Sequence, residues 1–109
     1  MEIVVVRPTP RKGEQLLSFF VMKFFVYILY SNSHNKSYVG FTSNMDERLI
    51  FHNNSENKKS YTYDFRPWIV IYTEEFETIE KAMLREKWFK SGVGRELKAK
   101  IISDYLKSK

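Results

Sequence analysis

Three stretches rich in β-branched and aromatic residues predict three β-strands, at residues 24–30, 37–41 and 68–76. Residues of these types favour strands because they pack well on a pleated, half-buried surface. A polar segment of six residues, Ser31–Lys36, separates the first two stretches, so we expect them to form an antiparallel hairpin. Pro67 precedes the third stretch, which places that strand's start or an edge of the sheet there.

Three further stretches have the spacing and the capping residues of α-helices. They are expected at residues 44–53, 78–91 and 95–106. Thr42 or Ser43 is the expected cap of the first helix and Thr78 that of the second, because their hydroxyls can accept from backbone N–H groups. Gly92–Gly94 is expected to interrupt the helical structure and so to separate the last two helices. The order β-β-α-β-α-α predicts an α/β (α+β) fold, a three-stranded antiparallel sheet flanked by helices.

Composition narrows the class of protein. A chain of 109 residues fits one domain, and 43% hydrophobic with 17% aromatic residues is too apolar for a disordered chain. The absence of cysteine excludes disulfides, a thiolate zinc site, an iron–sulfur cluster and a cysteine nucleophile. The formal net charge of +5 favours an anionic partner without identifying it.

The first 21 residues differ in pattern from the rest. We expect residues 1–21 to be a loosely ordered extension and residues 22–106 to be the domain, with Met22 as an alternative start. The apolar run at residues 16–30 is shorter than a membrane span needs and is interrupted by Lys23. Since no small-residue cleavage site follows it, we expect neither a signal peptide nor a membrane contact, and a cytoplasmic protein.

Helical spacing places one acid on an apolar stripe. Residues 79, 82, 83 and 89 form that stripe, and Glu86 falls within it. An unpaired buried carboxylate is costly. Glu86 is therefore either paired with Lys90 one turn later, or in reach of solvent at the stripe's edge, or a metal ligand.

Other candidate residues also have structural as well as functional interpretations. Arg48 and His52 share one helical face, which suits phosphate binding but also a surface ion pair and a packed histidine. Tyr27 and Tyr38 lie on the two hairpin strands, where tyrosines are commonly core residues. Gly40 costs a strand stability, so something is expected to approach the backbone closely there.

Together these residues resemble the GIY-YIG nuclease family. The half-motifs are Phe25-Val26-Tyr27 and Tyr38-Val39-Gly40, and Tyr38 follows Tyr27 by eleven positions. Arg48 follows Gly40 by eight positions, His52 lies one turn later, and Glu86 lies in Leu84-Arg85-Glu86-Lys87. The resemblance covers residues 22–106 and is closest to small single-domain members similar to the N-terminal domain of the excinuclease C subunit.

Two departures from the family's pattern stand out. Phe25 occupies the position of the opening glycine, and residues 92–109 contain no asparagine, which many members carry after the catalytic glutamate. Small members often lack both, so these departures are not interpreted as inactivation, although phosphate orientation is less well supported.

The resemblance implies a metal-dependent DNA endonuclease that leaves 5′-phosphate and 3′-hydroxyl ends, with a role in DNA repair or processing. Glu86 is then the metal ligand for Mg²⁺ or Mn²⁺, and Tyr27 is the general base. Tyr38 orients water or phosphate, Arg48 neutralises charge on phosphate oxygens, and His52 holds phosphate or assists proton transfer. Further contacts to the DNA backbone are implied for Gly40, Lys58, Lys59, Lys87, Lys90, Arg95 and Lys98.

The pattern leaves the substrate and two other functions open. The DNA could be branched, nicked or single-stranded, and the protein a monomer or a homodimer. One alternative is a non-catalytic nucleic-acid-binding module with the same fold, favoured by the missing asparagine and the small size. Another is an adaptor that uses its aromatic sheet for a protein partner.

Overall fold

The predicted strands form one antiparallel sheet in the computed structural model, which describes residues 23–54 and 61–109. The strands are β1 (Phe24–Ser31), β2 (Lys36–Thr42) and β3 (Ile69–Phe76), in the order β2-β1-β3. β1 is therefore central, which explains why it is the most apolar of the three, and β3 is an edge strand, as Pro67 indicates. The expected extension at residues 1–21 and two of the expected DNA contacts, Lys58 and Lys59, lie outside the described residues.

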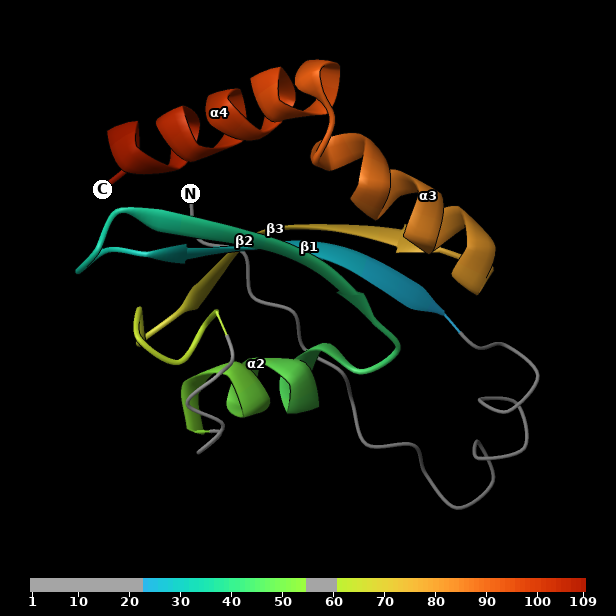
Figure 1. The fold of residues 1–109 in the computed structure, drawn as a ribbon, viewed down its shortest axis with the longest axis horizontal. Helices are drawn as coiled ribbons and strands as arrows, with labels where there is room; N and C mark the ends of the chain where they lie inside the picture. The colour runs from blue at the N-terminus through green and yellow to red at the C-terminus, as the bar shows by residue number, and fades with distance from the viewer. Residues whose placement is uncertain (1–22, 55–60) are drawn as a thin grey trace.

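Helices cover both faces of the sheet, which makes three layers (Figure 1). Helix α2 (Met45–Asn54) lies on one face, and helices α3 (Ile79–Phe89) and α4 (Gly92–Lys107) lie on the other. The predicted element order and fold class are thus confirmed.

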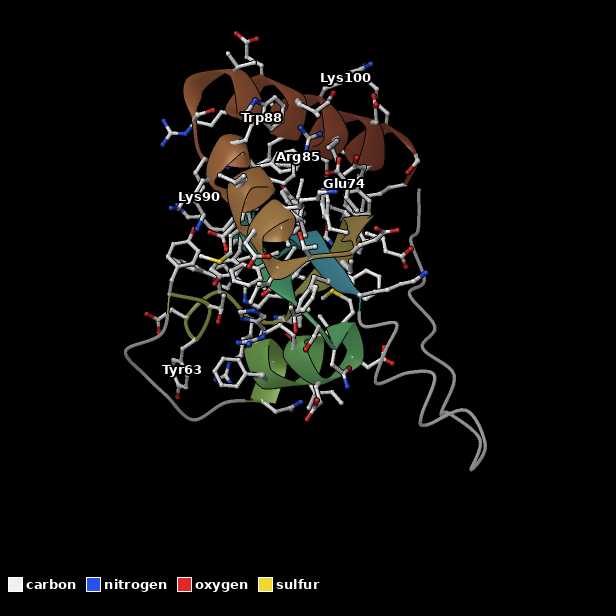
Figure 2. The ribbon with its side chains drawn as sticks, turned by 90° about the vertical axis from the view of Figure 1, so that its right-hand side faces the viewer. Tyr63, Glu74, Arg85, Trp88, Lys90 and Lys100 are labelled. Carbon is white, nitrogen blue, oxygen red and sulfur yellow. The ribbon has the colours of Figure 1, made fainter. Side chains whose placement is uncertain are left out.

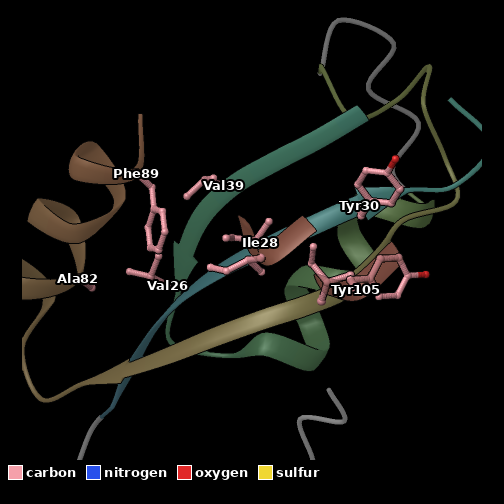
Figure 3. Packing of buried hydrophobic residues seen from close by; sticks show 9 residues of the cluster. Val26, Ile28, Tyr30, Val39, Ala82, Phe89 and Tyr105 are labelled. Atoms are coloured by element: carbon pink, nitrogen blue, oxygen red, sulfur yellow. The ribbon is translucent and has the colours of Figure 1, made fainter. Parts of the chain in front are cut away.

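Each face of the sheet has its own apolar core. The core under α3 and α4 takes Val26 and Ile28 from β1 and closes over them with Phe89 and Tyr105 (Figure 3). The core under α2 takes the alternate β1 residues, Tyr27 and Leu29, together with Met45 and Trp68. Successive strand residues point to opposite faces, so the continuous apolar run of β1 fills both cores.

Helix α2 is tied to the start of β3. The Asn53 side chain accepts from the backbone N–H of Trp68 at 2.6 Å and donates to its carbonyl at 3.1 Å. The Arg66 guanidinium donates to the Asn53 carbonyl at 3.3 Å, and the Arg66–Pro67 peptide is cis. This link fixes the loop of residues 61–68 against α2.

Two predicted helix boundaries were wrong. Asn44, rather than Thr42 or Ser43, caps α2: its side-chain oxygen accepts from the backbone N–H of Glu47 at 3.1 Å. Gly92–Gly94 does not separate the two helices, because α4 already begins at Gly92. The break lies at Lys90 and Ser91, where the Ser91 hydroxyl caps α4. Thr78 caps α3 as predicted.

A salt bridge joins α3 to β3. The Arg85 guanidinium donates two hydrogen bonds to the Glu74 carboxylate, at 2.7 and 2.9 Å, and the Tyr72 hydroxyl donates a third at 2.5 Å (Figure 2). The same guanidinium lies 4.1 Å from the centre of the Trp88 ring. Bidentate pairing of this kind fixes orientation as well as distance, so it holds the rotation of α3 about its axis.

Within residues 23–54 and 61–109, no helix is long and apolar enough to cross a membrane.

Candidate active site

An open pocket of about 390 Å³ lies at one end of the sheet, where β1 begins, β2 ends and α3 begins. Residues from helices on both faces of the sheet meet there because the sheet ends there. Its lining includes five residues singled out from the sequence: Tyr27, Tyr38, Gly40, Arg48 and Glu86.

Strand pairing brings the two tyrosines and the glycine together. Tyr27 pairs with Gly40 across the hairpin, and Tyr38 lies two positions before Gly40 on the same face. The rings of Tyr27 and Tyr38 are 6.2 Å apart.

Gly40 gives the Tyr27 phenol the space that it occupies. A Cβ atom at Gly40 would collide with the hydroxyl of Tyr27 and lie 3.0 Å from Cε1 of Tyr38. The close approach expected at this glycine is therefore made by side chains of the protein itself. A DNA contact at Gly40 stays a prediction.

The imidazole of His52 reaches the pocket through Tyr27. Its Nε2 lies 2.9 Å from the Tyr27 hydroxyl, and its Nδ1 lies 2.9 Å from the hydroxyl of Thr62, so both ring nitrogens are hydrogen bonded. His52 is only 4% exposed. The packed histidine and the functional histidine, alternatives in the sequence, are thus compatible in one position.

Burial and charge set the protonation of this pair. Burial raises the pKa of the Tyr27 phenol above its usual value, with smaller contributions from Tyr38 and Glu86, while Arg48 opposes the change. Burial, with Arg48 second, lowers the pKa of His52 to about 4. At neutral pH the pair is therefore a protonated phenol hydrogen bonded to a neutral imidazole.

Glu86 lines the pocket and also forms the predicted pair with Lys90. The Lys90 ammonium lies 3.1 Å from Oε1 of Glu86, and the Glu86 side chain is 19% exposed. Two of the interpretations left open by the sequence therefore hold together: Glu86 is paired with Lys90 and also reaches solvent.

The pocket suits a metal bound by a single carboxylate. Among the described residues there is no group of three or more His, Asp or Glu side chains able to hold a metal. Mg²⁺ is commonly held by one or two carboxylates, with water and phosphate oxygens completing its shell. Glu86, which lines an open pocket together with Tyr38, Thr42 and Ser43, fits that requirement.

Comparison with known proteins identifies the family. The model of the GIY-YIG catalytic domain matches residues 23–98. The chain belongs to the GIY-YIG family. The matched range holds every element from β1 to α3 and the first part of α4.

The relatives of this GIY-YIG domain are small proteins. UPF0213 protein SH2523 of Staphylococcus haemolyticus is 35% identical over 82 residues, which cover 75% of this chain and 96% of that protein. UPF0213 protein NP_0776A of Natronomonas pharaonis is 34% identical over 80 residues, covering 73% and 91%. The solution structure of UPF0213 protein BH0048 from Bacillus halodurans matches with a TM-score of 0.44 and 29% identity, covering 73% of this chain and 85% of that one.

Four cations predicted to contact DNA lie outside the pocket lining of this GIY-YIG domain. Lys90, Arg95 and Lys98 gather where α3 passes into α4: burial, then Arg95 and Lys90, lower the pKa of Lys98. Lys87 is an exposed residue of α3. Arg48 does line the pocket, with its guanidinium 5.4 Å from the centre of the Phe51 ring.

Sequence reasoning missed two supports of the GIY-YIG site. Thr62 lies in a polar loop, where nothing in the pattern separates it from its neighbours, yet it is buried against His52. Glu74 and Arg85 orient the helix that carries Glu86. Arg85 adjoins Glu86 in the sequence, but the acid partner on the third strand is a tertiary contact that helical spacing does not indicate.

Proposed function

We propose that this protein is a metal-dependent endonuclease that hydrolyses DNA phosphodiester bonds and leaves 5′-phosphate and 3′-hydroxyl ends. One observation carries the proposal: two phenols, a guanidinium and a carboxylate from four elements line one pocket, with an imidazole bonded to one of the phenols. Family membership, shown by the match to the catalytic domain, supports the same reaction.

Glu86 would hold Mg²⁺ or Mn²⁺, which supplies Lewis-acid stabilisation of the leaving oxygen. Arg48 would face the phosphate and neutralise charge that develops on its non-bridging oxygens. Tyr38 would orient the attacking water.

Tyr27 would take the proton from water, and its hydrogen bond to His52 supplies the means. A phenol whose pKa is raised by burial is a poor base while it keeps its own proton. The imidazole Nε2 is neutral and lies 2.9 Å from the phenol oxygen, so it is placed to accept that proton. Because burial lowers the pKa of His52 to about 4 and raises that of Tyr27, the transfer would need positive charge at the pocket, from Arg48 and a bound metal, to lower the pKa of the phenol. The Thr62 hydroxyl holds Nδ1 and so fixes the ring in this orientation.

Lys90 would leave Glu86 when substrate enters. The ammonium and the carboxylate form an i,i+4 pair, and the Lys90 side chain is largely exposed, so little energy holds it there. Lys90 would then join Arg95 and Lys98 in contacting backbone phosphates.

The test is cleavage of plasmid, branched and single-stranded DNA with Mg²⁺ or Mn²⁺. We expect Glu86→Ala and Tyr27→Phe to lower the rate by about 100-fold or more, as loss of a group that acts on the transition state does. Glu80→Gln, an exposed acid on the same helix, is the matched control and should cleave normally. Nicking that survives Glu86→Ala would contradict the proposal.

The Glu86–Lys90 pair favours one other function, a nucleic-acid-binding module without turnover. A carboxylate neutralised by its own lysine needs no metal. This function predicts that every DNA is bound, that none is cut, and that Glu86→Ala leaves binding unchanged.

A further inference from the structure

An exposed aromatic ring adjoins the pocket. The Tyr61 ring stacks on Tyr38, with centroids 6.1 Å apart and planes 26° from parallel, and Tyr38 lines the pocket. Tyr61 is nevertheless 51% exposed. Its hydroxyl donates to the carbonyl of Ser37 at 3.5 Å.

The row of rings continues away from the pocket. Phe65 lies 5.2 Å from Tyr61, and His34 of the hairpin turn lies 5.5 Å from Phe65, all measured between ring centroids. The Lys36 ammonium lies 5.5 Å from the centre of the Phe65 ring. We call Tyr61, Phe65, His34 and Lys36 the aromatic row.

The buried side chain of Trp68 holds the aromatic row in place. The Trp68 ring lies 6.3 Å from that of Tyr61 and is buried. The Trp68 indole donates to the carbonyl of Thr62 at 2.8 Å, which fixes the residue next to Tyr61. Tyr61 therefore exposes its ring to solvent from a loop that the buried Trp68 holds in place.

A ring row that begins at a phosphate-cleaving pocket and ends at a cation matches the chemistry of single-stranded nucleic acid. Bases stack on aromatic side chains whatever their sequence, while nearby cations contact the backbone. In a duplex the bases stack on each other and are not available to such a ring. A single exposed tyrosine would need no explanation. A row of rings that is continuous with the pocket can follow a nucleic-acid strand, and Lys36 offers the strand's phosphates a charge of opposite sign.

We propose that the aromatic row binds unpaired nucleobases beside the cleaved phosphate, with the base nearest the pocket stacked on Tyr61. This rests on the proposed function for the position of the phosphate. The protein would accordingly prefer DNA that is single-stranded at the cleavage point over continuous duplex.

The test measures binding of the full chain to a fluorescent 12-nucleotide single strand and to the matching duplex, in EDTA so that nothing is cut. Stacking is worth about 1–3 kcal/mol per base, so Tyr61→Ala should weaken single-strand binding by about 5- to 100-fold. Duplex binding should change less than about twofold by the same reasoning, since paired bases do not stack on Tyr61. Tyr61→Trp, which keeps a stacking ring, should retain single-strand binding.

Tyr63→Ala is the matched control in the same loop. Tyr63 packs against Arg66, with the guanidinium 4.2 Å from its ring centre, and is not part of the aromatic row. It should bind both DNAs as the native chain does. An equal loss in both alanine variants would show that the loop, not the ring, matters and would overturn the proposal.

Abasic substitution identifies stacking itself. In a set of single strands, each strand lacks one base at a different position. The native chain should lose affinity when one particular base is missing. Tyr61→Ala, which already lacks the stacking ring, should lose no further affinity with that strand. A 2-aminopurine at that position should be quenched on binding by the native chain alone. Equal losses in both proteins at every position would overturn the proposal.

Three further results separate the possibilities. Because these measurements need no cleavage, a chain that stacks bases but cuts nothing would contradict the proposed function alone, and a chain that cuts duplex and single strand equally, without stacking, would contradict this inference alone. Sedimentation velocity that shows a dimer dissociated by Tyr61→Ala would assign the aromatic row to a second copy and overturn the proposal.

Discussion

Tyr27 owes its position to three neighbours. Gly40 leaves room for the phenol, and His52 accepts or donates the hydrogen bond at its hydroxyl. Thr62 completes the chain of hydrogen bonds on the far side of the imidazole. Tyr27, which we propose as the general base, is thus held by Gly40, which contributes only the absence of a side chain, and, through His52, by Thr62, which the sequence did not indicate.

The buried His52 predicts a loss of stability in mild acid. The pKa of His52 is about 4 in the folded protein and about 6.5 in the unfolded chain. Between these two pH values His52 is protonated in the unfolded chain and neutral in the folded protein, so falling pH favours unfolding. The free energy of unfolding should therefore fall as the pH falls from about 6.5 to about 4, by up to about 3 kcal/mol. Urea unfolding at a series of pH values measures this decrease.

Variants isolate the contribution of His52 from that of the carboxylates. His52→Gln removes the titrating ring, so its unfolding free energy should change much less across this pH range than that of the native chain. His34→Gln, in the exposed hairpin turn, should keep the full decrease. A decrease that persists unchanged in His52→Gln would assign it to other groups.

At the scale of elements, the strands were predictable and the helix boundaries less so. β1 is predicted correctly because its composition fills cores on both faces, and such a run has few alternatives. The two glycines at 92 and 94 misled the prediction, since glycine usually ends helices. Here Ser91 caps a new helix at once, and glycine at position 94 is needed for another reason, a contact between helices that the sequence cannot show.

Gly94 lets the start of α4 pack against the end of α3. A Cβ at Gly94 would collide with the backbone carbonyl of Trp88 and lie 2.6 Å from the Cα of Phe89. Backbone cannot move aside as a flexible side chain can, so Gly94→Ala should lower the free energy of unfolding by about 1–3 kcal/mol or more.

Gly92→Ala is the control two residues earlier in the same helix. A Cβ there meets no atom of the described residues within 4 Å, so this variant should be neutral or more stable by up to about 1 kcal/mol. Thermal and urea unfolding compare the two. Equal effects would contradict the packing explanation.

The part of the candidate site that consists of motif residues could be predicted from the sequence. Tyr27, Tyr38, Arg48 and Glu86 were named from spacing, and the structure brings them to one pocket. Tyr61 and Thr62 were not, because both lie in a loop whose position depends on Trp68 and Asn53 rather than on any periodic pattern. Loop side chains reach a site through tertiary contacts, and single-sequence patterns carry little information about them.

At the scale of the whole molecule, positive charge gathers near the C-terminus. Residues 81–109 hold nine Lys or Arg and three acids, a net +6. Burial first, and then the nearby Arg95 and Lys90, disfavour the charge on Lys98; a polyanion would relieve the repulsion among these cations. Such contacts position a nucleic acid without reading its sequence.

This cluster predicts a specific change in salt dependence. Each phosphate neutralised contributes about −0.7 to −0.9 to the slope of log affinity against log salt concentration. Replacing Arg95 and Lys98 together by glutamine should therefore make the slope shallower by about 1.5 and weaken binding similarly for all sequences. Lys90 is left intact because it also pairs with Glu86.

Lys107→Gln is the matched control: it lies on the same helix, about 18 Å along its axis from Arg95, and should leave the slope unchanged. Anisotropy titrations from 50 to 300 mM salt measure both, at roughly the range where such slopes are resolved. An unchanged slope in the double variant would mean that the DNA backbone follows another face of the molecule, and that the cations of α4 serve solubility alone.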